Sequence, residues 1–303
     1  MNLSPTLNVA VSAAREAGNR VLRYFDNRHR LRIHEKQPND LVTNADTEAE
    51  QILVQSLSRA YPDYGIIAEE GGSRTQPGQH AWVIDPIDGT TNFVRGIPHF
   101  AITIALVLDD EIQSALIYQP VLQELFLAEK GRGAFLNNHR IRISDQETLE
   151  GAVLATGFPH RSKEHLKPYL SSFESLFTLS GGIRRAGSAA LDLAYVAAGR
   201  YDGFWEMKLA PWDIAAGILM VREAGGYTSD FAGGRESLRS GNILAANPHI
   251  HPTMLSHIAD SGLIDLEPVK PLRTKTVRTG SNRPDTGPRK ILRRKTQKST
   301  PSK

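Results

Sequence analysis

A short apolar strand that runs directly into two carboxylates constrains the fold of this chain more than any other feature. The strand, Trp82 to Ile84, delivers Asp85 to its end, and Pro86 then forces the chain to turn. This places Asp85 and Asp88 on one small arc, with the Ile87 carbonyl between them. Hard oxygen ligands of this kind suit Mg²⁺, which prefers them to imidazole or thiolate. The pattern predicts a metal site at the end of a strand.

A turn suited to phosphate follows immediately. Gly89, Thr90 and Thr91 offer hydroxyl groups and a backbone that a ligand can approach closely. Free N–H groups in such a turn bind phosphate oxygens in many proteins. Asp-Pro and Asp-Gly are also common in ordinary turns, so this segment alone leaves a purely structural role open. The same holds for the upstream Glu69-Glu70-Gly71, which alone reads as a solvated loop.

A third acidic segment strengthens the functional interpretation. Asp213 follows Pro211-Trp212 and precedes the apolar helix expected at Ile214 to Glu223, where a carboxylate can cap free N–H groups. As a helix cap alone it would be ordinary. Joined to the two earlier segments, it indicates a placed functional group. Metal carboxylates beside a phosphate-binding turn predict a site of phosphoryl transfer.

Composition is typical of a soluble cytoplasmic enzyme. The 303 residues, 40% of them hydrophobic, are enough to bury a sizeable core in one large domain or two lobes. We see no apolar run near the ~20 residues that a membrane span requires, and no secretory signal. The chain has no cysteine, which excludes disulfides and thiolate chemistry, and its ten histidines lack metal-ligand spacing.

Charge divides the chain into two regions. Residues 268–303 hold 12 Lys and Arg against one acid, Asp285, a net charge of +11, whereas residues 1–267 carry −8. We therefore expect a catalytic domain over 1–267 and a disordered basic tail over 268–303, because the tail lacks a core-forming pattern. Such a tail can contact nucleic acid non-specifically by charge, or simply be solvated without a partner.

Helix and strand patterns indicate a mixed, layered α/β sandwich. Four helices are expected. The first begins at Pro5, where apolar residues recur at helical spacing, and the second runs from after Asp46 to before Tyr61. The others are at Ser188 to Ala198 and in the segment that follows Asp213. The expected strands are Ile66 to Ala68, Trp82 to Asp85, Ala101 to Leu108, Ile112 to Gln119, Glu124 to Glu129, one around Val153, and Ile243 to Ala246.

The acidic segments together resemble the inositol monophosphatase family. The matching blocks are Glu69-Glu70, Asp85 to Asn92, and Trp212-Asp213 with Ala224-Gly225-Gly226, in the family's order over about residues 5–260. The stretch Arg184 to Tyr195 resembles the bacterial inositol-1-monophosphatase branch, which also contains a protein acting in antitermination of ribosomal RNA transcription. The resemblance implies an αβαβα sandwich of the inositol monophosphatase and fructose-1,6-bisphosphatase type.

The resemblance also implies the chemistry. It implies hydrolysis of inositol monophosphate, or a similar small polyol phosphate, by water with two or three Mg²⁺ ions and with inhibition by Li⁺. The first ion would be bound by Glu69, Asp85 and Ile87, and the second by Asp85, Asp88 and Asp213. Glu69 would orient the water, with Thr90 and Asp46 as a supporting relay. Lys36 matches a lysine that accompanies a third metal in some members.

Further residues would bind the substrate. By resemblance, the substrate contacts are Ile87, Asp88, Gly89, Thr90, Arg184, Ala189, Glu206 and Asp213. Gly89 and Thr90 would bind phosphate oxygens through N–H groups, while Glu206 and the Gly187–Ala189 turn would bind hydroxyls of the alcohol.

Two other functions stay open. The first is a phosphatase of the same fold acting on fructose-1,6-bisphosphate or 3′-phosphoadenosine phosphates. The intact Glu206, the short Gly71 to His80 connection and the lack of an evident basic pocket for a second phosphate favour a polyol monophosphate. The other is a role with RNA polymerase and antitermination factors, through the Arg184 to Leu193 surface or the tail. The family is generally homodimeric, and Ala189 to Ala198 with Arg184-Arg185 is the expected interface.

Overall fold

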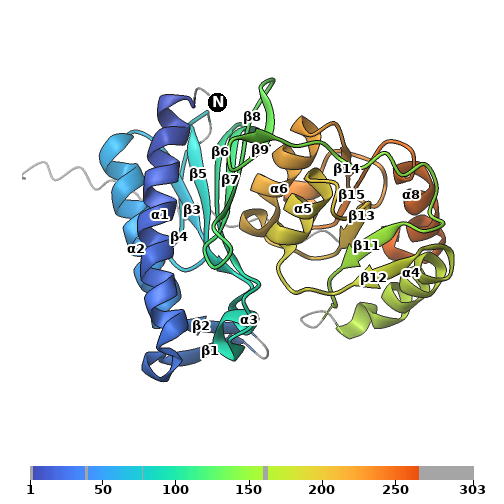
Figure 1. The fold of residues 1–303 in the computed structure, drawn as a ribbon, viewed down its shortest axis with the longest axis horizontal. Coiled ribbons are helices and arrows are strands. Elements are labelled where there is room, and N and C mark those ends of the chain that lie inside the picture. Colours follow the sequence, from blue (N-terminus) through green and yellow to red (C-terminus); the bar gives the residue numbers. More distant parts are fainter. Residues whose placement is uncertain (1–2, 38–39, 77, 160–162, 266–303) are drawn as a thin grey trace, which may run out of the picture.

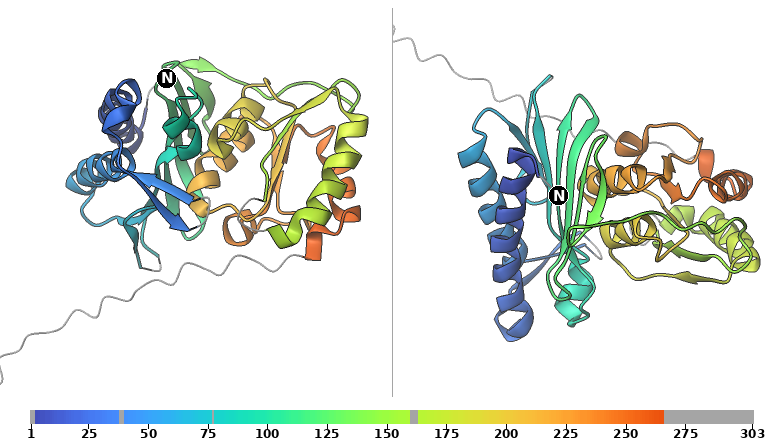
Figure 2. Two further views of the ribbon diagram at one scale, coloured as in Figure 1. Left: turned by 90° about the horizontal axis from the view of Figure 1, so that it is seen from below. Right: turned by 45° about the horizontal axis from the view of Figure 1, so that its top comes forward.

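Five layers of secondary structure stack side by side in the computed structural model (Figure 1). The structure describes residues 3–37, 40–76, 78–159 and 163–265, so the expected basic tail lies outside the described residues. Two helices form the first layer, an eight-stranded sheet the second, two helices the third, a five-stranded sheet the fourth and two helices the fifth. The views from below and from a tilted angle preserve this order (Figure 2). The expected αβαβα sandwich is confirmed.

Helices α1 (Pro5–Asp26) and α2 (Asn44–Ala60) form the outer layer beside the large sheet. The Ser4 side chain accepts a hydrogen bond from the Leu7 N–H, and Pro5 occupies the first helical position, where its missing N–H costs nothing. A capping box between Thr43 and Asp46 starts α2. Both helices bury their apolar faces against the sheet, which fixes the position of Asp46 near the site.

The large sheet is mostly antiparallel and runs in the order β10-β9-β8-β7-β6-β5-β3-β4. Among the described strands of this sheet, only β3 and β5 pair in parallel. Every residue of β5 is buried, because helices cover both faces of the sheet. The strands are β3 (Gly65–Ala68), β4 (Gly72–Arg74), β5 (Ala81–Asp88), β6 (Ala101–Leu108), β7 (Glu111–Gln119), β8 (Glu124–Glu129), β9 (Gly133–Leu136) and β10 (His139–Arg140).

Helices α5 (Ala189–Ala197) and α6 (Pro211–Glu223) fill the layer between the sheets. Eight of the nine residues of α5 are buried, as are eight of the thirteen of α6, and most of them belong to this core. The expectation that Ala189 to Ala198 forms a subunit interface is therefore wrong, because this apolar stretch packs inside its own chain. For the same reason, within the stretch Arg184 to Leu193 only the residues that precede α5 remain candidates for a surface that binds a partner.

The second sheet runs in the order β12-β11-β13-β15-β14 and carries α4 and α8 on its outer face. Its elements are β11 (Val153–Thr156), α4 (Leu166–Leu179), β12 (Gly182–Arg184), β13 (Gly203–Glu206), β14 (Tyr227–Ser229), β15 (Ile243–Ala246) and α8 (His251–Asp260). The remaining elements are β1 (Ile33–Gln37), β2 (Asp40–Thr43), α3 (Thr90–Arg95) and α7 (Ser237–Ser240), with three short 3₁₀ turns. Over the described ranges, none of the helices combines the length and hydrophobicity needed to span a bilayer.

Candidate active site

A bulge at the end of β5 brings the two strand carboxylates to one side. Asp85 pairs with Thr103 of β6, but Asp88 pairs with Ala101, so the register shifts between them. In a regular strand, residues three apart point to opposite faces of the sheet. The extra residue of the bulge cancels that alternation and allows Asp85 and Asp88 to approach one another. The Asp85 side chain also accepts a hydrogen bond from the Ile87 N–H at 2.8 Å, which stabilises the bend.

Asp213 joins these carboxylates from the inner helix layer. It is the third residue of α6, and its Oδ2 accepts a hydrogen bond from the Ala210 N–H at 2.7 Å. The Thr103 hydroxyl donates to the Trp212 carbonyl at 2.9 Å, which ties the start of α6 to β6. Asp85, Asp88 and Asp213 each offer one oxygen, and these atoms lie within 4.8 Å of one another. The sequence prediction that these acids converge is therefore met.

Burial makes this cluster a strong candidate for binding cations. Burial, with the negative charges of Glu69, Asp88 and Asp213, raises the pKa of Asp85 well above its usual value. Burial also raises the pKa of Asp88 to about 6, against the opposing hydrogen bonds from Ser188 and the Ala190 N–H. Bound divalent cations would offset this repulsion. Because all the donors are oxygens, the residues present fit Mg²⁺.

Glu69 lies at the end of β3, in a network of charged side chains that was only partly predicted from the sequence. The Lys36 Nζ lies 3.2 Å from Glu69 Oε1 and 2.5 Å from Glu70 Oε1. The pKa of Lys36 is lowered by burial but raised overall by attraction to these two carboxylates. Glu50 of α2 accepts a hydrogen bond from the Glu70 N–H at 2.8 Å and so fixes the loop from behind.

Thr90 and Asp46, which were expected to form a relay, lie next to one another beside the bulge. Asp46 Oδ2 accepts from the N–H and the hydroxyl of Thr43, while its Oδ1 lies 3.4 Å from the Thr90 hydroxyl. The Thr90 hydroxyl lies closer to the Ile87 carbonyl, at 3.0 Å. Burial raises the pKa of Asp46 to about 7, because hydrogen bonds from Thr43 only partly compensate. The hydroxyl thus has two acceptors, and a cation on the Ile87 carbonyl would leave Asp46 as its partner.

Glycine is required at position 89, in the turn after β5, for two reasons. Its φ is 95°, in the left-handed region that side chains disfavour. A Cβ atom there would also lie 3.1 Å from the His99 carbonyl and 3.2 Å from the Gly187 carbonyl. The turn therefore brings its backbone close to the segment preceding α5, and α3 begins at the next residue.

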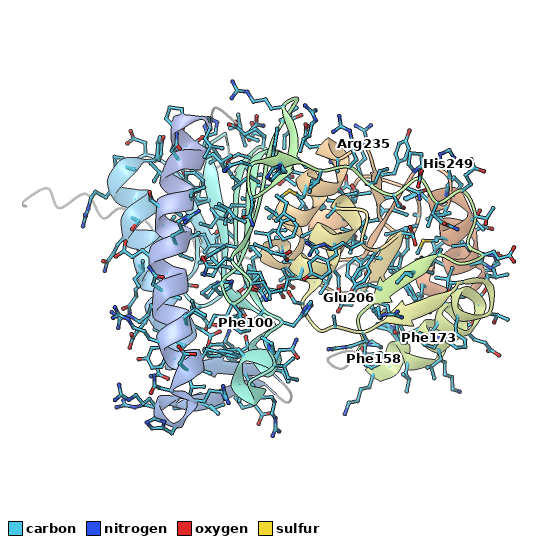
Figure 3. The ribbon with its side chains drawn as sticks, viewed as in Figure 1. Phe100, Phe158, Phe173, Glu206, Arg235 and His249 are labelled. Atoms are coloured by element: carbon cyan, nitrogen blue, oxygen red, sulfur yellow. The ribbon has the colours of Figure 1, made fainter. Side chains whose placement is uncertain are left out.

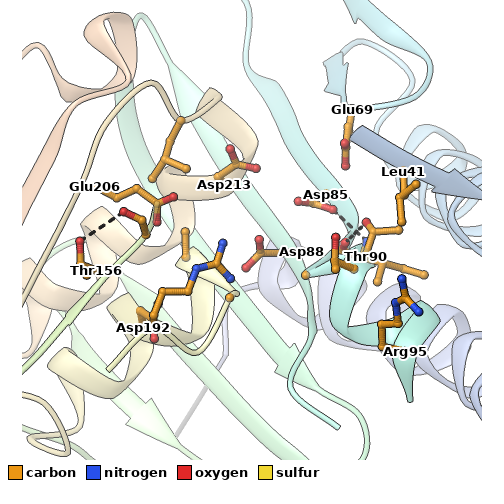
Figure 4. Close-up of a pocket in the computed structure, with 18 of the residues that line it drawn as sticks. Leu41, Glu69, Asp85, Asp88, Thr90, Arg95, Thr156, Asp192, Glu206 and Asp213 are labelled. Atoms are coloured by element: carbon orange, nitrogen blue, oxygen red, sulfur yellow. Dashed lines mark hydrogen bonds between the residues drawn. The ribbon is translucent and has the colours of Figure 1, made fainter. Parts of the chain in front are cut away.

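All but two of the predicted site residues line one pocket of about 560 Å³. It is the space between the large sheet and the C-terminal layers, where Figure 3 places Glu206. Figure 4 shows Glu206 and Asp192 on one side of the carboxylate cluster, with Thr90 and Arg95 on the other. The predicted lining residues are Glu69, Asp85, Ile87, Asp88, Gly89, Thr90, Ala189, Glu206 and Asp213.

The two exceptions are Asp46 and Arg184. Asp46 contacts Thr90 from behind. Arg184 is an exposed residue of β12 that does not line the pocket, whereas its neighbour Arg185 does. The Arg185 guanidinium lies 5.3 Å from the centre of the Phe158 ring. The alternation of side chains along an extended segment could have distinguished the two arginines, had the strand been recognised.

The structure reveals pocket residues that sequence reasoning missed. Arg95, Lys163 and Arg185 give the pocket basic groups that were not evident from the sequence. Gly157 leaves room for Glu206, because a Cβ atom on it would lie 1.9 Å from the Glu206 carboxyl group. Asp192, hidden in an apolar helix pattern, contributes a further acid.

The fold and the acidic site define a member of the inositol monophosphatase family. The sequence matches that family over residues 2–263, and the chain belongs to it. Nus factor SuhB of Pseudomonas aeruginosa is 49% identical over 261 residues, 84% of this chain and 96% of that protein. Inositol-1-monophosphatase of Rhizobium meliloti is 47% identical over 251 residues, covering 82% and 94%. The crystal structure of extragenic suppressor protein suhB from Bartonella henselae superposes with a TM-score of 0.82 at 46% identity, covering 84% and 98%.

Proposed function

We propose that this protein is a Mg²⁺-dependent phosphatase that hydrolyses inositol monophosphate or a similar small polyol phosphate. The observation that carries the proposal is the convergence of Asp85, Asp88 and Asp213 within 4.8 Å. The Gly89 turn begins immediately after Asp88 and lines the same pocket. The relative named inositol-1-monophosphatase supports the same conclusion. A cytoplasmic location is part of the proposal, because small polyol phosphates and the bacterial transcription machinery are both found in the cytoplasm.

Two or three Mg²⁺ ions would be held by the acidic residues. Glu69, Asp85 and the Ile87 carbonyl would hold one ion, and Asp85, Asp88 and Asp213 a second, with Lys36 and Glu70 beside a third. When bound, the ions supply charge neutralisation of the phosphate, activation of water and stabilisation of the leaving alcohol oxygen.

The chain's own residues orient the reactants. The N–H groups of Gly89 and Thr90 bind phosphate oxygens, as free amides in a turn do. Glu69 holds the attacking water, and the Thr90 hydroxyl, 3.4 Å from Asp46 Oδ1, completes the relay beside it. Glu206 and the backbone at Ala189 bind hydroxyls of the alcohol. Water attacks phosphorus in line as the bond between phosphorus and the alcohol oxygen breaks. One proton of the water stays on the phosphate and the other ends on the alcohol oxygen, so that hydrogen phosphate and the free alcohol leave.

The proposal is tested with a panel of phosphate esters assayed with Mg²⁺ and repeated with Li⁺. We expect turnover of inositol monophosphates that requires Mg²⁺ and falls at millimolar Li⁺, as the family resemblance implies. Turnover confined to bisphosphates would favour the second candidate, a fructose-1,6-bisphosphate or 3′-phosphoadenosine phosphatase. The basic groups Arg95, Lys163 and Arg185 are the observation that supports this alternative. If the protein hydrolyses none of these esters, the proposed phosphatase activity is refuted.

A role in transcription antitermination is proposed alongside catalysis. Its support is the name Nus factor SuhB carried by relatives at 46–49% identity, which align over nearly their whole length. We propose RNA polymerase or its antitermination factors as partners, together with non-specific nucleic acid for residues 268–303. Binding of purified polymerase and Nus factors to the protein, with inactive Asp88→Asn as a second sample, would test whether this role is independent of catalysis.

We also propose a homodimer, with α4 in place of α5 as its contact surface. Leu166, Leu170 and Phe177 are 46%, 51% and 57% exposed and follow one face of α4 at helical spacing. Phe158 is also exposed and, with Phe173, lies at the same end of the molecule (Figure 3). Exposed apolar groups gathered in this way mark interaction surfaces. Light scattering should report about twice 33.4 kDa, and Leu170→Glu should shift it toward the monomer.

A further inference from the structure

Asp192 is a buried acid of the pocket to which the proposed mechanism gives no role. It lies in the first turn of α5, is 1% exposed, and lines the pocket. Its Oδ1 atom is buried without a hydrogen-bond partner among the described residues. Leaving such a group unpaired is energetically costly, so its presence calls for an explanation.

The usual structural explanations fail for this side chain. No ion pair joins Asp192 to a cation in the described part of the chain, although the charge of Arg185 lowers its pKa. It lies outside the cluster of three carboxylates that approach within 4.8 Å. Helix-dipole stabilisation of an acid in the first turn would operate equally well on an exposed side chain and does not require burial.

The surroundings of Asp192 show on which side of the pocket its side chain lies. Figure 4 places it with Glu206 on the side opposite Thr90 and Arg95. After burial, the charge of Glu206 is the largest influence that raises the pKa of Asp192 well above its usual value. The two acids therefore lie near one another on the wall that faces the alcohol, away from the phosphate turn. A neutral carboxyl group both donates and accepts hydrogen bonds, as an alcohol hydroxyl does.

We propose that Asp192 is a specificity-determining residue that binds a hydroxyl group of the alcohol, next to the hydroxyl bound by Glu206. The pair selects polyol phosphates that present two hydroxyls to one wall. This inference rests on the proposed phosphatase function and adds a residue to its substrate site.

The test compares Asp192→Leu and Asp192→Asn with wild type on two substrates. Inositol 1-phosphate carries hydroxyls, whereas phenyl phosphate carries none. We expect the leucine variant to raise KM for inositol 1-phosphate about 10-fold, the loss of one hydrogen bond. Its kinetics with phenyl phosphate should stay unchanged, and the asparagine variant, which keeps polar atoms, should recover part of the affinity.

A control and a second readout separate the outcomes. Asp230→Asn removes another buried acid, whose oxygens accept backbone N–H groups of its own loop and which does not line the pocket. It should lower Tm without changing the ratio of the two KM values. Equal losses on both substrates, or no loss on either, in the Asp192 variants would overturn the proposal.

Ligand-induced thermal shifts keep the inference distinct from the proposed function. With Mg²⁺, wild type should be stabilised more by inositol 1-phosphate than by phenyl phosphate, and Asp192→Leu should lose that difference. If the variant loses the difference in stabilisation but wild type hydrolyses neither ester, the hydroxyl-binding role of Asp192 is supported and the proposed phosphatase activity is refuted. If wild type shows no preference for the polyol ester, the hydroxyl site is refuted.

Discussion

The two sheets contribute unequal chemistry to the same pocket. The large sheet provides Glu69 at the end of β3 and Asp85 and Asp88 at the end of β5, and the turn proposed to bind phosphate follows β5. The C-terminal half provides Glu206 at the end of β13, Gly157 just after β11, and Asp192 in α5. Asp213 of α6 is the one member of the carboxylate cluster from that half. Under the proposed function, the first half would carry out hydrolysis while the second would select the alcohol.

The largest expected effect comes from breaking the cluster of carboxylates. Asp88→Asn or Asp213→Asn removes a negative ligand while keeping side-chain shape, so folding should survive and Mg²⁺ affinity should fall. We expect losses of at least about 100-fold in kcat/KM, since even outer partners of metal ligands cost about 10–100-fold. The loss should be the same for inositol 1-phosphate and for phenyl phosphate.

Steady-state kinetics at several Mg²⁺ concentrations provides the check. Asp110→Asn is the matched control, because it removes an exposed acid that pairs only with surface Arg239 in the described structure. Near-normal turnover in Asp88→Asn at modest Mg²⁺ would contradict the metal site. A loss confined to the polyol ester would contradict the division of labour between the two halves.

A smaller and selective effect is expected from Gly157→Ala. The added Cβ would lie 1.9 Å from the Glu206 carboxyl group, so Glu206 must move away from the alcohol. We expect KM for inositol 1-phosphate to rise about 10-fold, as for the loss of a hydrogen bond to a charged group. Phenyl phosphate should be hydrolysed as by wild type.

A double-mutant cycle with Glu206→Gln gives the control. If Gly157 acts through Glu206, the double variant should be no worse than Glu206→Gln alone. Additive losses would mean that Gly157 matters for another reason, such as the conformation of the segment after β11.

The same contrast explains what the sequence could and could not predict. Asp85, Asp88 and the glycine turn follow a continuous apolar strand, so local pattern alone indicated a strand end with oxygen ligands. The opposite wall, proposed to face the alcohol, is assembled from β11, β13 and α5, and the paired strand residues Leu154 and Gly203 are separated by 49 positions in the chain. No local signal marks Gly157 or Asp192 as members of it. Apolar character likewise could not distinguish α5 as a core helix from a subunit interface.

A third prediction concerns the stability of the metal-free protein. Asp46 and Asp88 have pKa values raised to about 7 and about 6 from 3.8. As the pH rises, these acids ionise at a lower pH in the unfolded state than in the folded state. Their contribution to the free energy of unfolding is therefore full below the pKa of the unfolded state and is lost as the pH rises through the pKa of the folded state. Without Mg²⁺, Tm should therefore fall between pH 5 and pH 8. The full effect is of the order of a few kcal/mol.

Added Mg²⁺ should oppose this loss, because a cation stabilises the ionised carboxylates. Scanning calorimetry with and without Mg²⁺ should show a larger stabilisation at pH 8 than at pH 5. Asp88→Asn should have a flatter pH profile and a smaller Mg²⁺ effect. The substitutions Asp192→Leu and Gly157→Ala, on the alcohol wall, should leave the Mg²⁺ stabilisation intact.

The smallest effect on catalysis is expected from removing residues 268–303. All the predicted metal and phosphate ligands lie before residue 214, so truncation should leave kcat and KM unchanged. The segment carries a net charge of +11, so its loss makes the remaining chain acidic and should weaken retention on RNA. Binding by the full chain should fall steeply with salt, because neutralised phosphates release counterions. Full-length and truncated protein are compared on RNA at two salt concentrations. Equal RNA binding would mean that the segment has no nucleic-acid role, and a large loss of turnover would mean that it contributes to the pocket.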